Sequence, residues 1–231
     1  MLRIGHRGAM GYAPENTLAS FAKALELGVE GIELDVHLCR SGEPVVIHDS
    51  RVDRTTNGRG KVREMTLREL KELDAGQGEH LLTLEEVLNF VDHRLLIDIE
   101  LKSEGVGDPV AFTISQFIDS RGWKPEHFMI TSFDHHELVR CHSLIPRIPF
   151  GPLLAAKPLD YARMAQDMKA DGIMPFFEFL DNKFVQDAHQ RGLKVITWTV
   201  DRPDDIKRVM ELGVDGIISN YPDRLSKANI I

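Results

Sequence analysis

The fold is decided by a short run near the start of the chain, Gly31-Ile32-Glu33-Leu34-Asp35-Val36-His37-Leu38. Residues two apart on a β-strand point to the same face. Ile32, Leu34 and Val36 therefore face one way, toward covering helices, and Glu33 and Asp35 face the other way. Because the acidic face lies away from the helices, we expect it to line the interior of a closed parallel barrel.

Short apolar runs alternate with segments of helical periodicity along the whole chain. The runs occupy residues 2–5, 31–38, 95–101, 128–133, 148–154, 172–175, 194–200 and 216–221. Between the first two runs, the apolar residues have the spacing of an amphipathic helix: Leu18, Phe21, Ala22 and Leu25. Strands that alternate with helices form a parallel sheet covered by helices. Eight strands in 231 residues predict the α/β class and one (β/α)8 barrel domain over residues 1–231, since such barrels take about 200–250 residues.

One further apolar run, residues 44–47, breaks this alternation. It follows residues 31–38 after only five residues, and a parallel crossover needs a dozen or more, so the return is predicted to be an antiparallel hairpin. If its turn centres near Ser41 and Gly42, His48 lies opposite Asp35. Residues 49–82 are then predicted to form a small cap-like insertion after the second strand, with one short helix near residues 66–73.

Composition and charge narrow the class of protein. The hydrophobic share of 42% and the charged share of 28% are ordinary for a globular protein. The net charge is 28 − 36 = −8 with scattered basic residues, which argues against a nucleic-acid partner. No apolar run approaches the ~20 residues of a membrane span, and residues 1–6 show neither the long apolar run nor the small-residue cleavage site of a signal peptide. Cys39 and Cys141 lack metal-site spacing, so we expect reduced thiols in a cytoplasmic protein with no membrane partner. The oligomeric state is left open.

Carboxylates recur at the end of the next parallel strand. Asp98 and Glu100 repeat the arrangement of the first acidic pair, and Lys102 continues their face. A Glu100–Lys102 ion pair that only plugs the barrel is the structural alternative, but one lysine cannot neutralise a buried carboxylate cluster. We therefore predict that Glu33, Asp35 and Glu100 hold one divalent cation. Ligands that are all oxygen atoms select a hard ion, Mg²⁺ or Ca²⁺. Asp98, one step deeper, would support a ligand.

Two histidines stand at strand ends near these carboxylates. His6 ends the first run and is followed by Arg7, whose guanidinium can hold a phosphate through two parallel hydrogen bonds. His48 ends the hairpin return. Imidazole titrates near neutral pH, so the pair suits a reaction that needs one base and one acid. Glu15, in a segment that opens the first helix, is a plausible site contact, and Trp198 is either core packing or a pocket wall.

Together these motifs resemble the glycerophosphodiester phosphodiesterase family. The resemblance spans nearly the whole chain and is carried by His6-Arg7-Gly8, Pro14-Glu15-Asn16-Thr17, Glu33-Leu34-Asp35-Val36, Pro44-Val45-Val46-Ile47-His48-Asp49, Asp53-Arg54-Thr55-Thr56-Asn57-Gly58, Glu100-Leu101-Lys102, Trp198-Thr199-Val200 and Gly216-Ile217-Ile218-Ser219-Asn220-Tyr221-Pro222. The turn at residues 39–43 and Leu82 depart from the family pattern, outside the inferred chemistry.

The resemblance implies a TIM-type barrel that hydrolyses small glycerophosphodiesters, such as glycerophosphocholine or glycerophosphoethanolamine, to sn-glycerol 3-phosphate and an alcohol. It makes Glu33, Asp35 and Glu100 the metal ligands, and it makes His6 and His48 the acid–base pair. It also implies phosphate contacts from Arg7 and Lys102 and a site-lining role for Glu15. Trp198 joins the candidate substrate contacts.

Three other functions remain as alternatives. A phospholipase-type phosphodiesterase on intact or lyso-phospholipids would need an apolar rim or a basic interfacial patch, and the sequence shows neither. An amidohydrolase barrel would need a second histidine beside His6. A non-catalytic phosphate-ligand binding barrel would have lost a charged site residue. Within the favoured function, His6 is expected to be the base and His48 the acid, while the headgroup and the nucleophile are left open.

Overall fold

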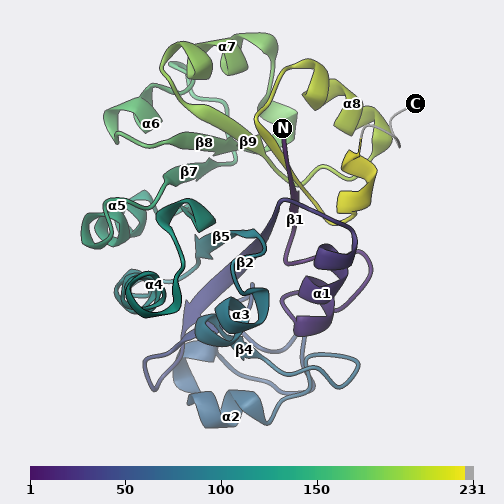
Figure 1. Ribbon diagram of the computed structural model, residues 1–231, viewed down its shortest axis with the longest axis vertical. Coiled ribbons are helices and arrows are strands. Elements are labelled where there is room, and N and C mark those ends of the chain that lie inside the picture. Colours follow the sequence, from purple (N-terminus) through teal and green to yellow (C-terminus); the bar gives the residue numbers. More distant parts are fainter. Residues whose placement is uncertain (227–231) are drawn as a thin grey trace.

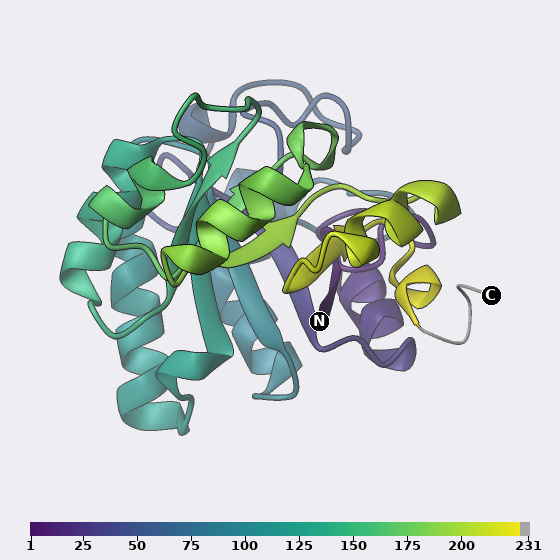
Figure 2. The same ribbon diagram turned by 90° about the horizontal axis from the view of Figure 1, so that it is seen from above.

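The computed structural model describes residues 1–226 and shows a closed barrel of eight parallel strands surrounded by helices (Figure 1). The strands follow one another around the barrel, and β1 closes it by pairing with both β10 and β2. The predicted (β/α)8 fold is confirmed. Viewed from above, the helices form an outer layer around the strands (Figure 2).

The elements alternate as the periodicity predicted. The strands are β1 (Leu2–Gly5), β2 (Gly31–Leu38), β3 (Pro44–Val46), β4 (Leu82–Thr83), β5 (Leu96–Leu101), β6 (Phe128–Ser132), β7 (Phe150–Leu154), β8 (Gly172–Pro175), β9 (Lys194–Thr197) and β10 (Gly216–Ser219). The helices are α1 (Leu18–Glu26), α2 (Leu67–Lys71), α3 (Leu84–Val91), α4 (Gly107–Arg121), α5 (His135–Leu144), α6 (Arg163–Asp167), α7 (Asn182–Gln190) and α8 (Pro203–Glu211), with 3-10 turns η1 (Val62–Glu64), η2 (Pro125–His127), η3 (Phe177–Phe179) and η4 (Pro222–Leu225).

The two faces of β2 have the predicted environments. Ile32, Leu34 and Val36 are fully buried in the apolar core that the strands share with the helices. On the opposite face, the parallel register of β2 and β5 places Glu33 beside Asp98 and Asp35 beside Glu100. The acidic face therefore lies inside the barrel, as predicted. The rest of the interior is filled by a separate apolar cluster of Ile4, Met129, Leu153, Met174, Ile196 and Ile218.

The hairpin of β2 and β3 is antiparallel as predicted, but its predicted register is wrong by one residue. Val36 pairs with Val46, and the backbone nitrogen of Ile47 donates to the carbonyl of Asp35 at 3.0 Å. The reason is an odd-numbered turn centred on Ser41, closed by a bond from the Cys39 nitrogen to the Glu43 carbonyl at 3.1 Å. His48 thus lies one residue beyond the partner of Asp35.

Residues 49–82 pack beside this hairpin (Figure 1). They share a small apolar cluster with it, formed by Cys39, Val45, Ile47, Val52, Val62, Leu70, Ala75 and Leu81. The predicted short helix is α2, and Thr66 and Glu69 form its capping box. The segment ends at β4, which pairs with β3 and was not predicted. No helix among residues 1–226 combines the length and apolarity that crossing a bilayer would need.

Candidate active site

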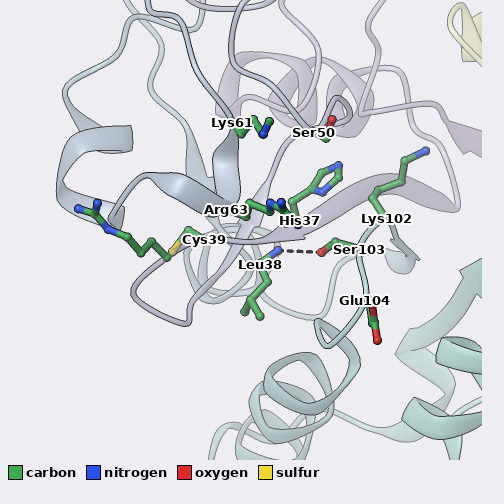
Figure 3. A pocket seen from close by; sticks show the side chains of 10 residues that line it. His37, Leu38, Cys39, Ser50, Lys61, Arg63, Lys102, Ser103 and Glu104 are labelled. Carbon is green, nitrogen blue, oxygen red and sulfur yellow. Dashed lines mark hydrogen bonds between the residues drawn. The ribbon is translucent and has the colours of Figure 1, made fainter.

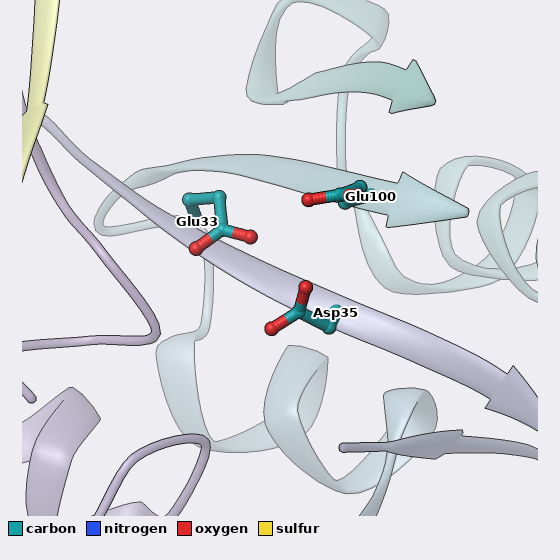
Figure 4. A group of neighbouring side chains, drawn as sticks. All are labelled: Glu33, Asp35 and Glu100. Atoms are coloured by element: carbon teal, nitrogen blue, oxygen red, sulfur yellow. The ribbon is translucent and has the colours of Figure 1, made fainter. Parts of the chain in front are cut away.

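Three carboxylates from β2 and β5 meet inside the barrel (Figure 4). One oxygen each from Glu33, Asp35 and Glu100 can be chosen so that all three lie within 4.8 Å of one another. Glu33 and Asp35 are buried, and the Glu100 side chain is only 12% exposed. Buried Glu33 Oε1 and Asp35 Oδ1 have no hydrogen-bond partner among the described residues. Because buried polar atoms are almost always satisfied, these two oxygens indicate a missing positive partner such as a metal ion.

The carboxylates differ in how readily they ionise. Burial, together with the charge of Asp35, raises the pKa of Glu33 well above its ordinary value and raises the pKa of Glu100 to about 7. Burial also opposes ionisation of Asp35, but the cationic Arg7 and Lys102 outweigh it and lower the pKa of that carboxyl. A bound cation would favour the ionised form of all three groups.

Two cationic side chains border the cluster. The Arg7 backbone nitrogen donates to Glu33 Oε2 at 2.9 Å, and its guanidinium Nε lies 3.2 Å from Asp35 Oδ2. Lys102 Nζ lies 2.7 Å from Glu100 Oε1 and 3.5 Å from Asp35 Oδ1. The Glu100–Lys102 ion pair therefore exists, and Lys102 also lies within ion-pair distance of Asp35, but Glu33 Oε1 and Asp35 Oδ1 still accept no hydrogen bond from the described residues.

Asp98 lies one step below this cluster, as expected for a supporting residue. Its Oδ1 accepts a hydrogen bond from Thr131 Oγ1 at 2.9 Å, and the side chain is 1% exposed. Burial, with a smaller contribution from Glu100, raises the pKa of Asp98 to about 8.

His6 stands beside the cluster with one nitrogen fixed by its neighbours. Its Nδ1 lies 2.6 Å from Asn220 Oδ1, and its Nε2 lies 3.9 Å from Glu33 Oε2. Asn220 donates its Nδ2 to Asp201 Oδ2 at 2.6 Å, which turns the amide oxygen toward His6. His6 Nδ1 must then carry the proton, and Nε2 presents its lone pair to the site. Burial and the charge of Arg7 lower the pKa of His6 to about 4.

His48 has an anionic partner instead. Its Nδ1 lies 2.6 Å from Asp49 Oδ1, and the side chain is 32% exposed. Asp49 in turn accepts from Arg54 Nε at 2.8 Å and from Arg54 Nη2 at 2.9 Å. Hydrogen bonds from Arg54, followed by those from His48, hold the pKa of Asp49 far below its usual range. The carboxylate therefore stays ionised and accepts a hydrogen bond from Nδ1 of His48, which orients the ring.

Glu15 connects these two parts of the site. It accepts from Arg7 Nη1 at 2.8 Å and from Arg54 Nη1 at 2.7 Å, and its side chain is 10% exposed. Burial opposes its ionisation, but its bonds to Arg54 and Arg7 lower its pKa. A chain of charge pairs thus runs from Arg7 through Glu15 and Arg54 to Asp49.

Five residues of this network had no role predicted from the sequence. They are Asn16, which donates to Asp35 Oδ2 at 3.0 Å, and Asp49, Arg54, Asp201 and Asn220. Four of them lie inside the family motifs quoted above, so these motifs could have identified them as candidate site residues. Asp201 lies just beyond one, and nothing in its local pattern distinguished it.

Trp198 forms part of an aromatic wall after β6, β8 and β9. Its Nε1 donates to the Met174 carbonyl at 2.8 Å, and its ring centroid lies 5.4 Å from that of Phe133 and 5.2 Å from that of Phe176. Phe133 is 45% exposed, and Lys102 Nζ lies 6.0 Å from its ring centroid. Phe133 therefore brings this wall next to Lys102, which pairs with Glu100, and the sequence had not revealed this small apolar surface.

Gly8 has a conformation that only glycine adopts easily. Its φ is +86°, and an added Cβ would lie 2.4 Å from Ser20 Oγ and 2.7 Å from the Ser20 carbonyl carbon. Gly8→Ala should therefore lower the free energy of unfolding by about 2–4 kcal/mol, measured by urea denaturation. Gly28→Ala is the matched control, because its φ is +66° but no atom lies within 4 Å of the added Cβ. Equal losses in both variants would contradict the clash.

Acidic, basic and imidazole side chains gathered at the carboxyl ends of barrel strands define a (β/α)8-barrel enzyme. The model of the Glycerophosphoryl diester phosphodiesterase family matches residues 6–224. The chain therefore belongs to this family and is a glycerophosphodiester phosphodiesterase, as the resemblance implied.

Similar proteins agree on this family over almost the full length. A glycerophosphodiester phosphodiesterase of Caldanaerobacter subterraneus subsp. tengcongensis is 39% identical over 237 residues, covering 97% of this chain and 96% of the relative. One of Bacillus subtilis is 33% identical, with 98% and 86% covered. A solved phosphodiesterase of Oleispira antarctica, in complex with the product sn-glycerol-3-phosphate, superposes with a TM-score of 0.88 at 31% identity, covering 96% and 94% of the two chains.

Proposed function

We propose that the protein hydrolyses glycerophosphodiesters, such as glycerophosphocholine and glycerophosphoethanolamine, to sn-glycerol 3-phosphate and an alcohol. One divalent cation, Mg²⁺ or Ca²⁺, would be held by Glu33, Asp35 and Glu100. The observation that carries this proposal is the buried carboxylate cluster, in which two oxygens accept no hydrogen bond from the described residues. The Oleispira antarctica relative, which binds sn-glycerol-3-phosphate, supports the choice of product.

The charged side chains around the cluster would bind the phosphate. When bound, the cation would withdraw charge from a non-bridging phosphate oxygen. Arg7 and Lys102 lie on two sides of Asp35 and would hold the other phosphate oxygens by charge-assisted hydrogen bonds. Glu15 would keep the Arg7 guanidinium in place, and Trp198 would contact the carbon skeleton of the substrate.

The two histidines would move the protons. His6 is neutral and turns Nε2 into the site, so it would accept a proton from the attacking hydroxyl. The base would be the same for either nucleophile: whether water or the glycerol 2-hydroxyl attacks, its proton would go to His6 Nε2. His48, paired with the ionised Asp49, would donate a proton to the departing alcohol.

The structure also supports a single working domain. We infer that residues 1–231 act as one phosphodiesterase unit, with residues 49–82 as a small cap-like insertion. The support for the insertion's role is Arg54, which reaches from it to Glu15.

The direct test incubates the protein with glycerophosphocholine and follows glycerol 3-phosphate. Chelator should stop the reaction, and Mg²⁺ or Ca²⁺, added separately, should restore it. No product with either metal would contradict the proposal. Choline phosphate as the product would mean cleavage on the other side of phosphorus.

One alternative substrate has an observation in its favour. The aromatic wall of Phe133, Phe176 and Trp198 could receive the first carbons of an acyl chain, as a phospholipase-type activity on lyso-phospholipids requires. Lysophosphatidylcholine, tested beside glycerophosphocholine, separates the two: faster release of choline from the lysolipid would favour this alternative.

Without metal, the free energy of unfolding should fall as pH rises from about 4 to about 8. Burial raises the pKa of Glu100 from 4.5 to about 7 and that of Asp98 from 3.8 to about 8. Between these values the folded state binds more protons than the unfolded state, so rising pH favours unfolding. A tenfold difference in proton affinity corresponds to about 1.4 kcal/mol, so these two groups together should cost several kcal/mol. The lowered pKa of His6 offsets part of this loss between about pH 4 and pH 6.5, because there the unfolded state binds the additional proton. Urea denaturation in chelator across this range measures the slope. Glu100→Gln should flatten it, and stability that rises with pH would contradict the prediction.

A further inference from the structure

A groove of about 600 Å³ lies next to the carboxylate cluster and shares Lys102 with it. Its lining residues are drawn in Figure 3. Lys102 lines it and also contacts Glu100 and Asp35, so the groove begins at the site of reaction. His37, another lining residue, follows Glu33 and Asp35 on the same face of β2 and continues that face outward. The volume is within the range of small-molecule sites.

Three parts of the chain form the groove walls. They are the β2–β3 hairpin, the segment of residues 49–82, and the residues that follow β5. Figure 3 shows Lys61 and Arg63 on one side of His37 and Lys102, Ser103 and Glu104 on the other. The Leu38 backbone nitrogen donates a hydrogen bond to Ser103 Oγ at 3.1 Å, which joins two of these walls.

The groove is cationic although the chain carries a net charge of −8. Its described lining includes one acidic residue, Glu104, and the cationic residues Arg40, Lys61, Arg63 and Lys102. Lys61 pairs with Glu64 at 3.0 Å and Arg40 with Glu69 at 3.1 Å, but all four of these side chains are at least 45% exposed. Exposed pairs of this kind contribute little, so both cations can turn to an anionic ligand.

We infer that this groove receives the alcohol portion of the substrate and favours glycerophosphodiesters whose alcohol carries a second phosphate. The inference rests on the proposed function. Lys102, at the inner end of the groove, binds the phosphate whose ester bond is cleaved. The second phosphate lies further out, where it binds Lys61, Arg63 and Arg40. Arginine matches phosphate through two parallel hydrogen bonds. A trimethylammonium headgroup would face like charges in the same place.

The test compares three substrates: glycerophosphocholine with a cationic alcohol, glycerophosphoglycerol with a neutral one, and bis(glycerophospho)glycerol, whose alcohol carries a second phosphate. At low ionic strength, kcat/KM per scissile bond should be about 10-fold higher for bis(glycerophospho)glycerol than for glycerophosphocholine. The preference should shrink with added salt, because exposed charges are screened.

The double variant Lys61→Gln, Arg63→Gln should lose most of this about 10-fold preference. The loss should come from a higher KM for bis(glycerophospho)glycerol. The single variant Arg63→Gln should remove part of the preference, and it replaces the double variant in the test if that variant folds poorly. Arg68→Gln is the matched control: its side chain is 91% exposed on α2, outside the groove, and its preference should equal that of the unaltered protein.

The possible failures are distinguishable. Equal or faster cleavage of glycerophosphocholine, or an unchanged preference in the double variant, would overturn the inference and leave the proposed function intact. Cleavage of none of the three substrates with Mg²⁺ or Ca²⁺ would overturn the proposed function, and the inference with it.

Discussion

Glu33→Gln should reduce the turnover of glycerophosphocholine at least about 10³-fold, a loss of several kcal/mol of transition-state stabilisation. Glu33 contributes a buried oxygen that accepts no hydrogen bond from the described residues, and glutamine keeps the size of the side chain but removes its negative charge. A cation bound by Asp35 and Glu100 alone would lose one of its three protein ligands. The measurement is kcat/KM with saturating Mg²⁺ and, separately, Ca²⁺.

A second measurement on the same variant does not depend on turnover. The unaltered protein should melt at a higher temperature when Mg²⁺ or Ca²⁺ is added, because a ligand that binds only the folded state stabilises it. Glu33→Gln should lose most of this increase. In chelator the variant should be at least as stable as the unaltered protein, since burial no longer opposes a carboxylate at this position.

Glu85→Gln is a matched control, because Glu85 is an exposed residue in the first turn of α3. It should change neither the turnover nor the metal-dependent rise in melting temperature. If Glu33→Gln keeps its turnover, or if metal still raises its melting temperature as in the unaltered protein, Glu33 is not a ligand.

Part of this cluster could be predicted from sequence because strand geometry is regular. The two-residue repeat placed Glu33 and Asp35 on one face, and the β2–β5 pairing brings Glu100 directly beside Asp35. The hairpin register was predicted less well, because it depended on whether the turn between β2 and β3 holds an odd or an even number of residues. A shift of one residue changes every pairing in such a hairpin.

Contacts between distant segments could not be predicted in this way. His6 meets Asn220 across 214 residues of sequence only because β1 closes the barrel by pairing with β10. Arg54 meets Glu15 across 39 residues through the packing of a segment without regular strands. Local periodicity contains no information on either contact, so the partners of the candidate acid and base became visible only in the structure.

His6→Ala and His48→Ala should each reduce kcat for glycerophosphocholine by about 10²–10⁴-fold, the usual contribution of a general acid or base. Loss of turnover alone does not separate their roles. The two side chains differ in their partners: His6 Nδ1 contacts the neutral amide of Asn220, and His48 Nδ1 contacts the carboxylate of Asp49. Burial and the charge of Arg7 lower the pKa of His6 to about 4, so its imidazole is neutral at pH 7, whereas the ring of His48 is oriented by an ionised carboxylate.

A substrate with a better leaving group distinguishes base from acid. The p-nitrophenyl ester of glycerol 3-phosphate releases an alcohol that needs little protonation, so the general acid becomes nearly dispensable. His48→Ala should then lose at most about 10-fold in kcat on this ester, whereas His6→Ala should keep its full loss of about 10²–10⁴-fold, because the nucleophile still needs a base. The reverse pattern would exchange the two roles. An equal loss on both esters in both variants would mean that neither histidine protonates the leaving group. His136→Ala is the matched control, since this exposed histidine in the first turn of α5 should leave both rates unchanged.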